Sequence, residues 1–428
     1  MVVNKVNGLS GELKVPGDKS ISHRCIMLGS IAKGDTEVYG FLQGADCLSS
    51  ISCFRKMGIA IENEGERVVI HGNGLHGLKK SDEILDVGNS GTTIRLMSGI
   101  LAAQDFESKV NGDASIQKRP MGRIMVPLGM MGADIKSEND NGCAPLLIKG
   151  TKLKGIHYNS PVASAQVKSG ILFAGLYADG ETKVTEPYVS RNHTELMFRD
   201  FGADIVTAGK TVTVKPAEEL YARRVDVPGD ISSAAYFIAA GLIVENSVIT
   251  IKDVGINPTR DGMIEVCKMM NADIEIKEKD NSSAEPVADI IVRTSGLKAC
   301  TIGGELIPKL IDEIPIIAVM ACYAEGTTII KDAQELKVKE SNRIDSIVNN
   351  LKAMGADVVA TEDGMIINGN PDKNLKGAKI DSRLDHRIAM SFTIAGLTAS
   401  GDTEILNSEC VDISYPAFYK SLERLIKR

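Results

Sequence analysis

Apolar and small residues fill nearly every position in six stretches of the chain. Each stretch is followed by a short turn rich in Gly, Asp or Asn and then by a β-branched run. The six stretches start at Ser22, Ser90, Ala165, Ile231, Glu313 and His386. A helix that is apolar around its whole circumference is buried rather than amphipathic. The pattern therefore predicts six buried helices, clearest over 231–244 and 314–323. Their recurrence at roughly 65–80 residues indicates internal duplication.

Each repeat also contains a second helix, which is amphipathic and ends in a Met-Gly-Ala-Asp-like turn before another strand. Five such turns follow Met57, Met131, Phe201, Met270 and Met354. Glycine ends these helices because it accepts a positive φ without Cβ strain. The sixth helix, 416–428, has no strand after it, and the strands before Val15 have no helix before them. We therefore expect the first strands of the chain to complete its last repeat.

The tetrapeptide VPGD occurs twice, at 15–18 and at 227–230. A chain of 428 residues is too long for one ordinary core, so two domains are expected. We interpret the two copies as crossovers, near 14–18 and 226–230, between two three-unit halves. The N-terminal domain would be 15–227, and the C-terminal domain would combine 1–14 with 228–428. The predicted fold is α/β, with two similar domains, each made of three βαβαββ-type units around buried helices.

Composition narrows the class of protein. The formal net charge is −7, which argues against a general nucleic-acid or membrane-surface binder. The eight cysteines form no CxxC pair and several lie in apolar runs, which is typical of reduced thiols in a cytosol. The first residues have no apolar signal segment, and the longest apolar run is too short to cross a bilayer. These observations predict a soluble cytoplasmic protein.

The polar residues that interrupt the apolar pattern gather where the buried helices begin. They lie at 19–24, 89–93, 164–168, 312–313 and 385–387. A helix N-terminus offers unpaired N–H groups and a positive dipole end, so it favours anions. Several such starts, with Lys and Arg among them, predict a cleft for a small ligand with several negative charges. Taken alone, Ser20, Ser164 and Asp312 could each equally be a plain helix cap. Taken alone, a turn is favoured for 89–92, a surface residue before a proline for Arg119, and a solvated charge run for 337–343.

Nine motifs carry a resemblance that covers essentially the whole chain. They are VPGDKSISHR (15–24), GNSGTT (88–93), QKRPM (117–121), SAQVKS (164–169), SRNHTE (190–195), PGDISSAA (228–235), DEIP (312–315), KESNR (339–343) and DHRIAM (385–390). In this order they resemble the 5-enolpyruvylshikimate-3-phosphate (EPSP) synthases, the enolpyruvyl transferases of the shikimate pathway to chorismate and aromatic amino acids. The resemblance implies an inside-out α/β barrel fold.

The resemblance also implies the ligands. The substrates of that family are shikimate 3-phosphate and phosphoenolpyruvate, and a basic cleft in an acidic protein suits both. By resemblance, shikimate 3-phosphate is held by Lys19, Ser20, Arg24, Ser164, Gln166, Arg191, Asp312 and Lys339. Phosphoenolpyruvate is held by Lys19, Gly91, Arg119, Gln166, Arg343 and Arg387. No metal, organic cofactor, nucleic acid or membrane is implied as a partner, and the family is usually monomeric.

The reaction adds the 5-hydroxyl of shikimate 3-phosphate to C2 of phosphoenolpyruvate while C3 gains a proton. Phosphate then leaves as C3 loses a proton. We hypothesise that Asp312 is the base on the 5-hydroxyl and that Glu340 exchanges the C3 proton. Lys19 would neutralise developing charge.

Some positions depart from the family pattern. Ile413 stands where many members carry a lysine, and Asn342 stands where aspartate is common. Gly91 is intact, which favours sensitivity to the inhibitor glyphosate, whereas Leu96 and Ile413 leave that sensitivity open.

Three other functions compete with this one. UDP-N-acetylglucosamine enolpyruvyl transferases share the architecture, but they usually place a catalytic cysteine where Ala114 lies here. RNA 3′-terminal phosphate cyclases use related units, but the acidic balance argues against nucleic acid. A phosphosugar sensor without turnover would be expected to lose Asp312, Glu340 or Lys19, and all three are present.

Overall fold

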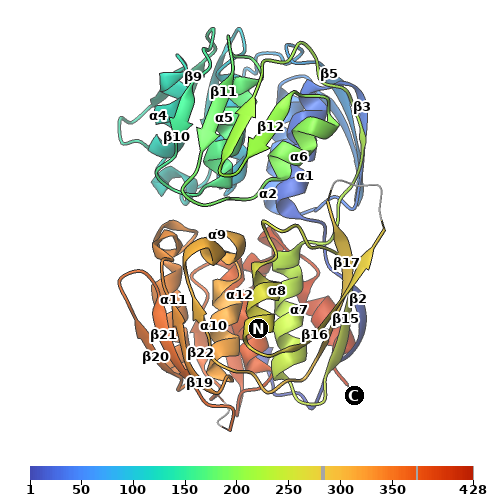
Figure 1. The fold of residues 1–428 in the computed structure, drawn as a ribbon, viewed down its shortest axis with the longest axis vertical. Helices are drawn as coiled ribbons and strands as arrows, with labels where there is room; N and C mark the ends of the chain where they lie inside the picture. The colour runs from blue at the N-terminus through green and yellow to red at the C-terminus, as the bar shows by residue number, and fades with distance from the viewer. Residues whose placement is uncertain (281–284, 373–374, 428) are drawn as a thin grey trace. The chain divides into compact units, whose positions relative to one another are not determined.

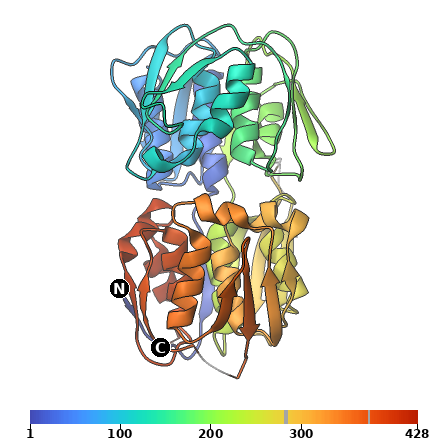
Figure 2. The ribbon, with the colours of Figure 1, turned by 90° about the vertical axis from the view of Figure 1, so that its left-hand side faces the viewer.

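The computed structural model describes residues 1–280, 285–372 and 375–427 and groups them into two compact units. Unit 1 contains residues 1–16, 228–280 and the described residues from 286 onward. Unit 2 contains residues 17–227 together with Glu285. In both views the first residues of the chain, drawn in the darkest blue, run with the yellow-to-red segments of unit 1 (Figures 1 and 2).

Unit 2 is built around three buried helices, and α3 packs against both of the others. They are α1 (Lys19–Ile31), α3 (Gly91–Leu101) and α5 (Ala165–Gly175). Three amphipathic helices follow them in turn along the chain: α2 (Ala45–Lys56), α4 (Gly122–Met130) and α6 (His193–Asp200). A short 3-10 helix, η1 (Ile116–Lys118), precedes α4.

Three four-stranded sheets complete unit 2, and in each the first pair of strands is parallel and the others antiparallel. The first is β14 (Arg224–Asp226), β3 (Lys33–Tyr39), β5 (Arg67–Asn73) and β4 (Ala60–Glu64). The second is β6 (Leu85–Asp86), β7 (Glu107–Asn111), β9 (Leu146–Lys149) and β8 (Asp134–Ser137). The third is β10 (His157–Asn159), β11 (Thr182–Thr185), β13 (Thr211–Val214) and β12 (Ile205–Ala208).

Unit 1 repeats this plan with three buried helices that all pack on one another. They are α7 (Ile231–Ile243), α10 (Ile314–Cys322) and α12 (His386–Gly396), which lie side by side within the unit in Figure 1. The amphipathic helices are α8 (Gly262–Met269), α11 (Arg343–Ala353) and α13 (Phe418–Leu425). Shorter helices are η2 (Gly304–Leu306), α9 (Ile307–Leu310), η3 (Gln334–Val338) and η4 (Ser408–Ile413).

The described strands of unit 1 form two four-stranded sheets and one of three strands. The first is β2 (Ser10–Lys14), β15 (Val248–Gly255), β17 (Val287–Arg293) and β16 (Asp273–Lys279). The second is β18 (Thr301–Ile302), β19 (Gly326–Ile330), β21 (Met365–Gly369) and β20 (Asp357–Ala360). The third is β22 (Lys379–Asp381), β23 (Thr403–Leu406) and β1 (Val2–Val3).

Strand pairing explains why the chain carries two VPGD stretches. In four of the repeats, the strand before a buried helix pairs in parallel with the strand after it, as in β6–β7, β10–β11, β18–β19 and β22–β23. The two strands that lead into VPGD do otherwise. Strand β2 precedes α1 but pairs with β15 after α7, whereas β14 precedes α7 but pairs with β3 after α1. Each unit therefore takes its first parallel strand from the segment that leads into the other unit.

The expectation that the first strands complete the last repeat was half right. Strand β1 pairs with β23 in the last sheet, as predicted. Strand β2 was assigned wrongly, because it joins β15 in the fourth repeat. Strand β14, which precedes α7, pairs with β3 and is therefore not available to β15. Strand β2 is the parallel partner of β15 instead.

The helix predictions were confirmed in detail. Every residue of α7, α10 and α12 is buried. The predicted turns have positive φ at Gly58, Gly132, Gly202, Asn271 and Gly355, as a left-handed helix end requires. The predicted last helix, 416–428, is shorter in the structure, α13 spanning Phe418–Leu425, and residue 428 lies outside the described residues.

Close packing of α3 on α5 depends on glycine. A Cβ at Gly99 would lie 2.0 Å from the carbonyl oxygen of Gly170, a backbone atom that cannot turn aside. We expect Gly99→Ala to lower the free energy of unfolding by about 1–3 kcal/mol through overpacking. Gly129→Ala is the matched control, because its Cβ meets nothing within 4 Å and alanine favours a helix by about 1 kcal/mol. Urea denaturation of both variants measures this, and equal stability of the two would contradict the packing argument.

Candidate active site

In unit 2 the predicted residues begin at the N-terminus of α1. Asp18 caps this helix, its Oδ1 accepting a hydrogen bond from the Ile21 N–H at 2.9 Å. Lys19 is the first residue of the helix, and its Nζ lies 3.1 Å from Oδ2 of Asp46, in the first turn of α2. The cap is therefore Asp18 rather than Ser20, which is left in the first helical turn with its hydroxyl accepting from Nη1 of Arg191 at 3.3 Å.

Arg24 lies one turn further along α1 and is buried. Its guanidinium donates to Thr194 Oγ1 at 2.6 Å, to the Ser20 carbonyl at 2.8 Å and to Ser169 Oγ at 2.8 Å. Burial lowers the pKa of Arg24 to about 10, which still leaves it charged at neutral pH. Hydrogen bonds from Arg24 thus link α1 to Ser169 of α5 and to Thr194 of α6.

The start of α3 is linked to that of α1 by hydroxyl groups. His23 Nδ1 is 2.9 Å from Ser50 Oγ, which is 2.8 Å from Thr93 Oγ1. Burial lowers the pKa of His23 well below its ordinary value, and Lys19 and Arg24 lower it further. His23 is therefore neutral at physiological pH and serves as a hydrogen-bonding group.

Gly91 and Gln166 bring α3 and α5 together. Gln166 accepts from Arg95 Nη1 at 2.7 Å and donates to Thr92 Oγ1 at 3.0 Å. A Cβ at Gly91 would lie 2.8 Å from Nη1 of Arg95 and 3.1 Å from Nη1 of Arg119, so glycine lets both guanidinium groups approach the helix start. Arg119 is held by Asn89, whose Oδ1 accepts from its Nη2 at 2.9 Å.

Ser164 caps α5, its hydroxyl accepting from the Val167 N–H at 3.4 Å. Unit 2 thus gathers eight predicted residues at the starts of α1, α3 and α5 and in the segments just before α4 and α6: Lys19, Ser20, Arg24, Gly91, Arg119, Ser164, Gln166 and Arg191.

In unit 1 the five remaining predicted residues form one charged network. Arg343, the first residue of α11, is 1% exposed and contacts three carboxylates: Asp385 at 2.8 Å, Glu340 at 2.6 Å and Asp312 at 3.3 Å. Asp312 Oδ1 also lies 3.7 Å from Lys339 Nζ and 3.9 Å from Arg387 Nε. Glu313, not Asp312, is the cap residue of α10, so the Asp312 carboxylate is placed among cations instead.

In this network burial disfavours the charged forms of Arg343 and Asp385, but neighbouring groups of opposite charge outweigh that effect. Burial lowers the pKa of Arg343, but Asp385 and Glu340 outweigh it, and the net pKa lies above the ordinary value. Burial likewise raises the pKa of Asp385, but Arg343 outweighs it and holds that pKa below the ordinary value. Arg343 and Asp385 are therefore both charged at neutral pH.

Sequence reasoning missed several charged partners. Asp46, Glu186 and Asp385 contact predicted residues or their backbone, yet none was assigned a role. Asp385 precedes His386 and Arg387 at a helix start, which was a usable signal. Glu186 is a single acidic residue after a strand, and no local pattern distinguishes it from a surface residue.

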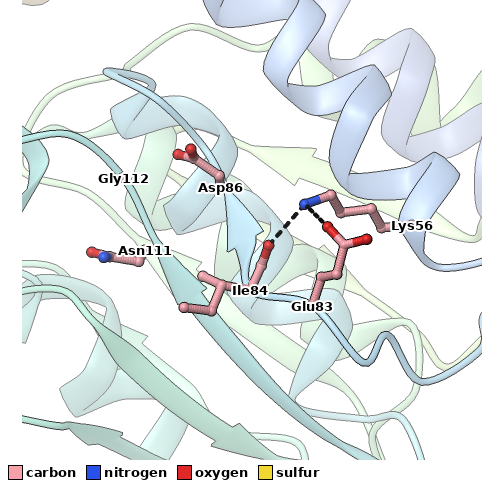
Figure 3. Close-up of a pocket in the computed structure, with 6 residues that line it drawn as sticks. All are labelled: Lys56, Glu83, Ile84, Asp86, Asn111 and Gly112. Atoms are coloured by element: carbon pink, nitrogen blue, oxygen red, sulfur yellow. Dashed lines mark hydrogen bonds and ion pairs between the residues drawn. The ribbon is translucent and has the colours of Figure 1, made fainter.

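A separate hollow in unit 2, of about 440 Å³, contains none of the predicted residues (Figure 3). It is lined by Lys56, Glu83, Ile84, Asp86, Asn111 and Gly112. Figure 3 shows the Lys56 ammonium between the Glu83 carboxylate, at 2.7 Å, and the Ile84 carbonyl, at 3.2 Å. Lys56 is already paired with Glu83, and the hollow contains a second carboxylate, Asp86. This hollow therefore does not suit an anionic ligand.

The described residues offer neither a metal site nor a membrane-spanning helix. Within that part of the chain no group of three or more His, Cys, Asp or Glu is placed to hold a metal ion. None of the described helices combines the length and apolar character needed to cross a membrane.

The chain matches known proteins over nearly its whole length. The family model described as EPSP synthase (3-phosphoshikimate 1-carboxyvinyltransferase) matches residues 3–422. The chain belongs to the EPSP synthase family. A 3-phosphoshikimate 1-carboxyvinyltransferase from Thermoanaerobacter sp. (strain X514) is 57% identical over 99% of both chains. One from Bacillus velezensis is 54% identical, again over 99% of both.

A solved structure of EPSP synthase from Acinetobacter baumannii has a TM-score of 0.88 and 46% identity, covering 99% of this chain and 97% of that one. This match confirms the predicted α/β class and its inside-out arrangement, and the family match confirms the resemblance read from the nine motifs.

The structure gives a context for two departures from the EPSP synthase pattern. Asn342 is the cap residue of α11 and accepts from the Asp345 N–H at 3.4 Å. Asparagine and aspartate cap helices about equally well, so this position keeps its structural task. Ile413 ends η4 and packs, half buried, against the core of unit 1.

The Asp385–Arg343 pair can be tested by its pH dependence. We expect Asp385→Asn to lower the free energy of unfolding at pH 7 by about 2–4 kcal/mol, because it leaves a buried guanidinium poorly compensated. Because the folded-state pKa of Asp385 is depressed, its stabilisation is complete above its unfolded pKa of about 4 and is lost as the pH falls through the folded value.

The stability difference between wild type and Asp385→Asn should therefore shrink on acidification, as measured by urea denaturation from pH 7 downward. Glu404→Gln, which removes an exposed partner of Lys379 at 3.5 Å, is the control and should change stability by less than about 1 kcal/mol. A difference that stays constant with pH would show that the charge of Asp385 is not what matters.

Proposed function

We propose that the eight predicted residues of unit 2 and the charged network of unit 1 supply the binding and catalytic groups for the reaction of this family. As a family member the chain has 3-phosphoshikimate 1-carboxyvinyltransferase activity, with shikimate 3-phosphate and phosphoenolpyruvate as substrates, in the shikimate pathway. The enolpyruvyl group is transferred to the 5-hydroxyl of shikimate 3-phosphate, and phosphate is released. The roles of individual residues, given next, are our assignment.

Shikimate 3-phosphate is assigned to Lys19, Ser20, Arg24, Ser164, Gln166 and Arg191 of unit 2, with Asp312 and Lys339 of unit 1. The support within unit 2 is that Ser20 contacts Arg191 and Arg24, so a cation and a helix start adjoin one another. Such a combination favours phosphate, because N–H groups, the helix dipole and a guanidinium act on it together.

Phosphoenolpyruvate is assigned to Lys19, Gly91, Arg119, Gln166, Arg343 and Arg387. Arginine suits this ligand because its planar fork bonds phosphate and carboxylate through two parallel N–H groups. The approach of Arg119 to Gly91, where a side chain would collide with it, supports this set.

The catalytic assignment rests on one observation above all: Arg343 contacts both Asp312 and Glu340. Asp312 would take the proton of the 5-hydroxyl while the hydroxyl oxygen forms its bond to C2 of phosphoenolpyruvate. Glu340 would give a proton to C3 in that step and take one back as the C–O bond to phosphate breaks. Lys19, held by Asp46, would stabilise the charge that develops on the departing phosphate.

We also propose that the two units are the domains of a monomeric, cytoplasmic enzyme. Support for the cytoplasm comes from the cysteines: all eight are among the described residues and none is in a disulfide. Reduced thiols are usual in that compartment.

Phosphate release is the direct test of the function. Purified protein given phosphoenolpyruvate should release phosphate with shikimate 3-phosphate as acceptor and not with UDP-N-acetylglucosamine. Release with the nucleotide sugar alone would assign the chain to the sister activity, and release with neither would leave a binding protein.

Glu340→Gln tests the proton transfer. We expect kcat to fall by about 10²–10⁴-fold, the usual contribution of a general acid–base group. Both apparent KM values should change much less, because the amide still accepts from Arg343. Stopped assays of phosphate release over a range of each substrate separate the two effects.

A second readout of the same variant follows exchange at C3. With wild type, turnover in deuterated water should place deuterium at C3 of recovered phosphoenolpyruvate, and Glu340→Gln should prevent it. Unchanged turnover with normal exchange would refute the role of Glu340.

A further inference from the structure

Three charged side chains are buried together in unit 2, outside every proposed binding set. Lys168 Nζ lies 2.7 Å from Glu195 Oε1 and 3.0 Å from Glu186 Oε2, and each of the three side chains is 2–3% exposed. Burial lowers the pKa of Lys168, but Glu195 and Glu186 outweigh it, so the net pKa is raised and the ammonium stays charged. Apolar side chains of similar volume would usually serve stability as well as such a cluster does.

Glu186 follows β11 and its carboxylate reaches two backbone segments. Its Oε1 accepts from the Ser164 N–H at 3.0 Å, directly at the cap of α5. Its Oε2 accepts from the Ser190 hydroxyl at 2.8 Å and from the Ser190 N–H at 3.3 Å. One carboxylate therefore connects the residue that begins α5 with the residue that precedes Arg191.

Lys168 and Glu195 extend the connection into two helices. Lys168 lies in the first turn of α5 and also donates to the Ser190 carbonyl at 3.3 Å. Glu195 lies in the first turn of α6, next to Thr194, whose hydroxyl accepts from Arg24. Ser190, the residue before Arg191, is thus held through its N–H, its carbonyl and its hydroxyl at once by groups of this cluster.

We propose that Glu186, charge-balanced by Lys168, is a positioning residue that sets Ser164 and Arg191 for shikimate 3-phosphate. This rests on the proposed function, because the binding roles of Ser164 and Arg191 belong to it. Glu186 acts through hydrogen bonds to their backbone segments rather than by touching substrate. The buried charges give directional contacts that an apolar cluster would lack.

The test is Glu186→Gln, which keeps the shape of the side chain and removes its charge. We expect the dissociation constant for shikimate 3-phosphate, measured by calorimetry without phosphoenolpyruvate, to rise at least about tenfold, since a charge-assisted contact is lost at both segments. At saturating substrates kcat should stay within about threefold, because Asp312, Glu340 and Lys19 are untouched.

Phe173→Leu is the matched control. Phe173 of α5 packs edge-to-face on Phe198 of α6, with the ring centroids 5.0 Å apart. The variant therefore weakens the packing of the same two helices without altering the charged cluster. It should lower Tm and leave the affinity for shikimate 3-phosphate unchanged. If Glu186→Gln behaves like this control, losing stability but not affinity, the cluster is structural and the proposal is wrong.

Arg191→Gln separates this proposal from the proposed function. If Arg191→Gln weakens shikimate 3-phosphate binding and Glu186→Gln does not, only the positioning role fails. If Arg191→Gln leaves binding intact, the assigned role of Arg191 fails and the positioning proposal fails with it.

Ser190→Ala covers the case in which Glu186→Gln does not fold. This variant removes only the hydroxyl contact to Glu186 at 2.8 Å. It should raise the same dissociation constant about threefold, a fraction of the full effect, with kcat unchanged. An unchanged dissociation constant would overturn the proposal.

Discussion

Burial of six apolar helices is the constraint on which the rest of this structure depends. The basic residues that these helices carry, Lys19, His23, Arg24, Arg95, Lys168, His386 and Arg387, all lie in their first two turns. The remaining turns are packed against other helices and sheets, where a charge would have no water and no partner. Chemistry is therefore concentrated at the helix starts, where N–H groups and the helix dipole favour anionic ligands.

Charges placed at buried helix starts require partners, and those partners give the site its order. Arg343 is held by three carboxylates, Arg24 by two hydroxyls and a carbonyl, and Lys168 by two glutamates. Each network links segments that are far apart in the sequence. Side chains fixed in this way lose little further freedom when a ligand binds, which is how such sites are preorganised.

Much of this was predictable because it is local. Period, turn residues and helix caps depend on neighbours within a few positions, so the buried helices and their positive-φ ends could be located from the pattern. The positions of Gly91, Gln166 and Arg387 at helix starts followed in the same way. The exchange of β2 and β14 was not predictable in full, because nothing in a strand of five or three residues states which parallel edge it joins.

The sequence by itself determined the repeats, the burial of their first helices, the family and the residue types at the helix starts. Only the tertiary structure decided which charges meet: Asp46 with Lys19, Asp385 with Arg343, and Glu186 with Lys168 and the Ser164 backbone. The physical reason is that an ion pair within about 4 Å depends on chain packing between distant segments. A single carboxylate after a strand carries no local sign of the partner that packing will bring to it.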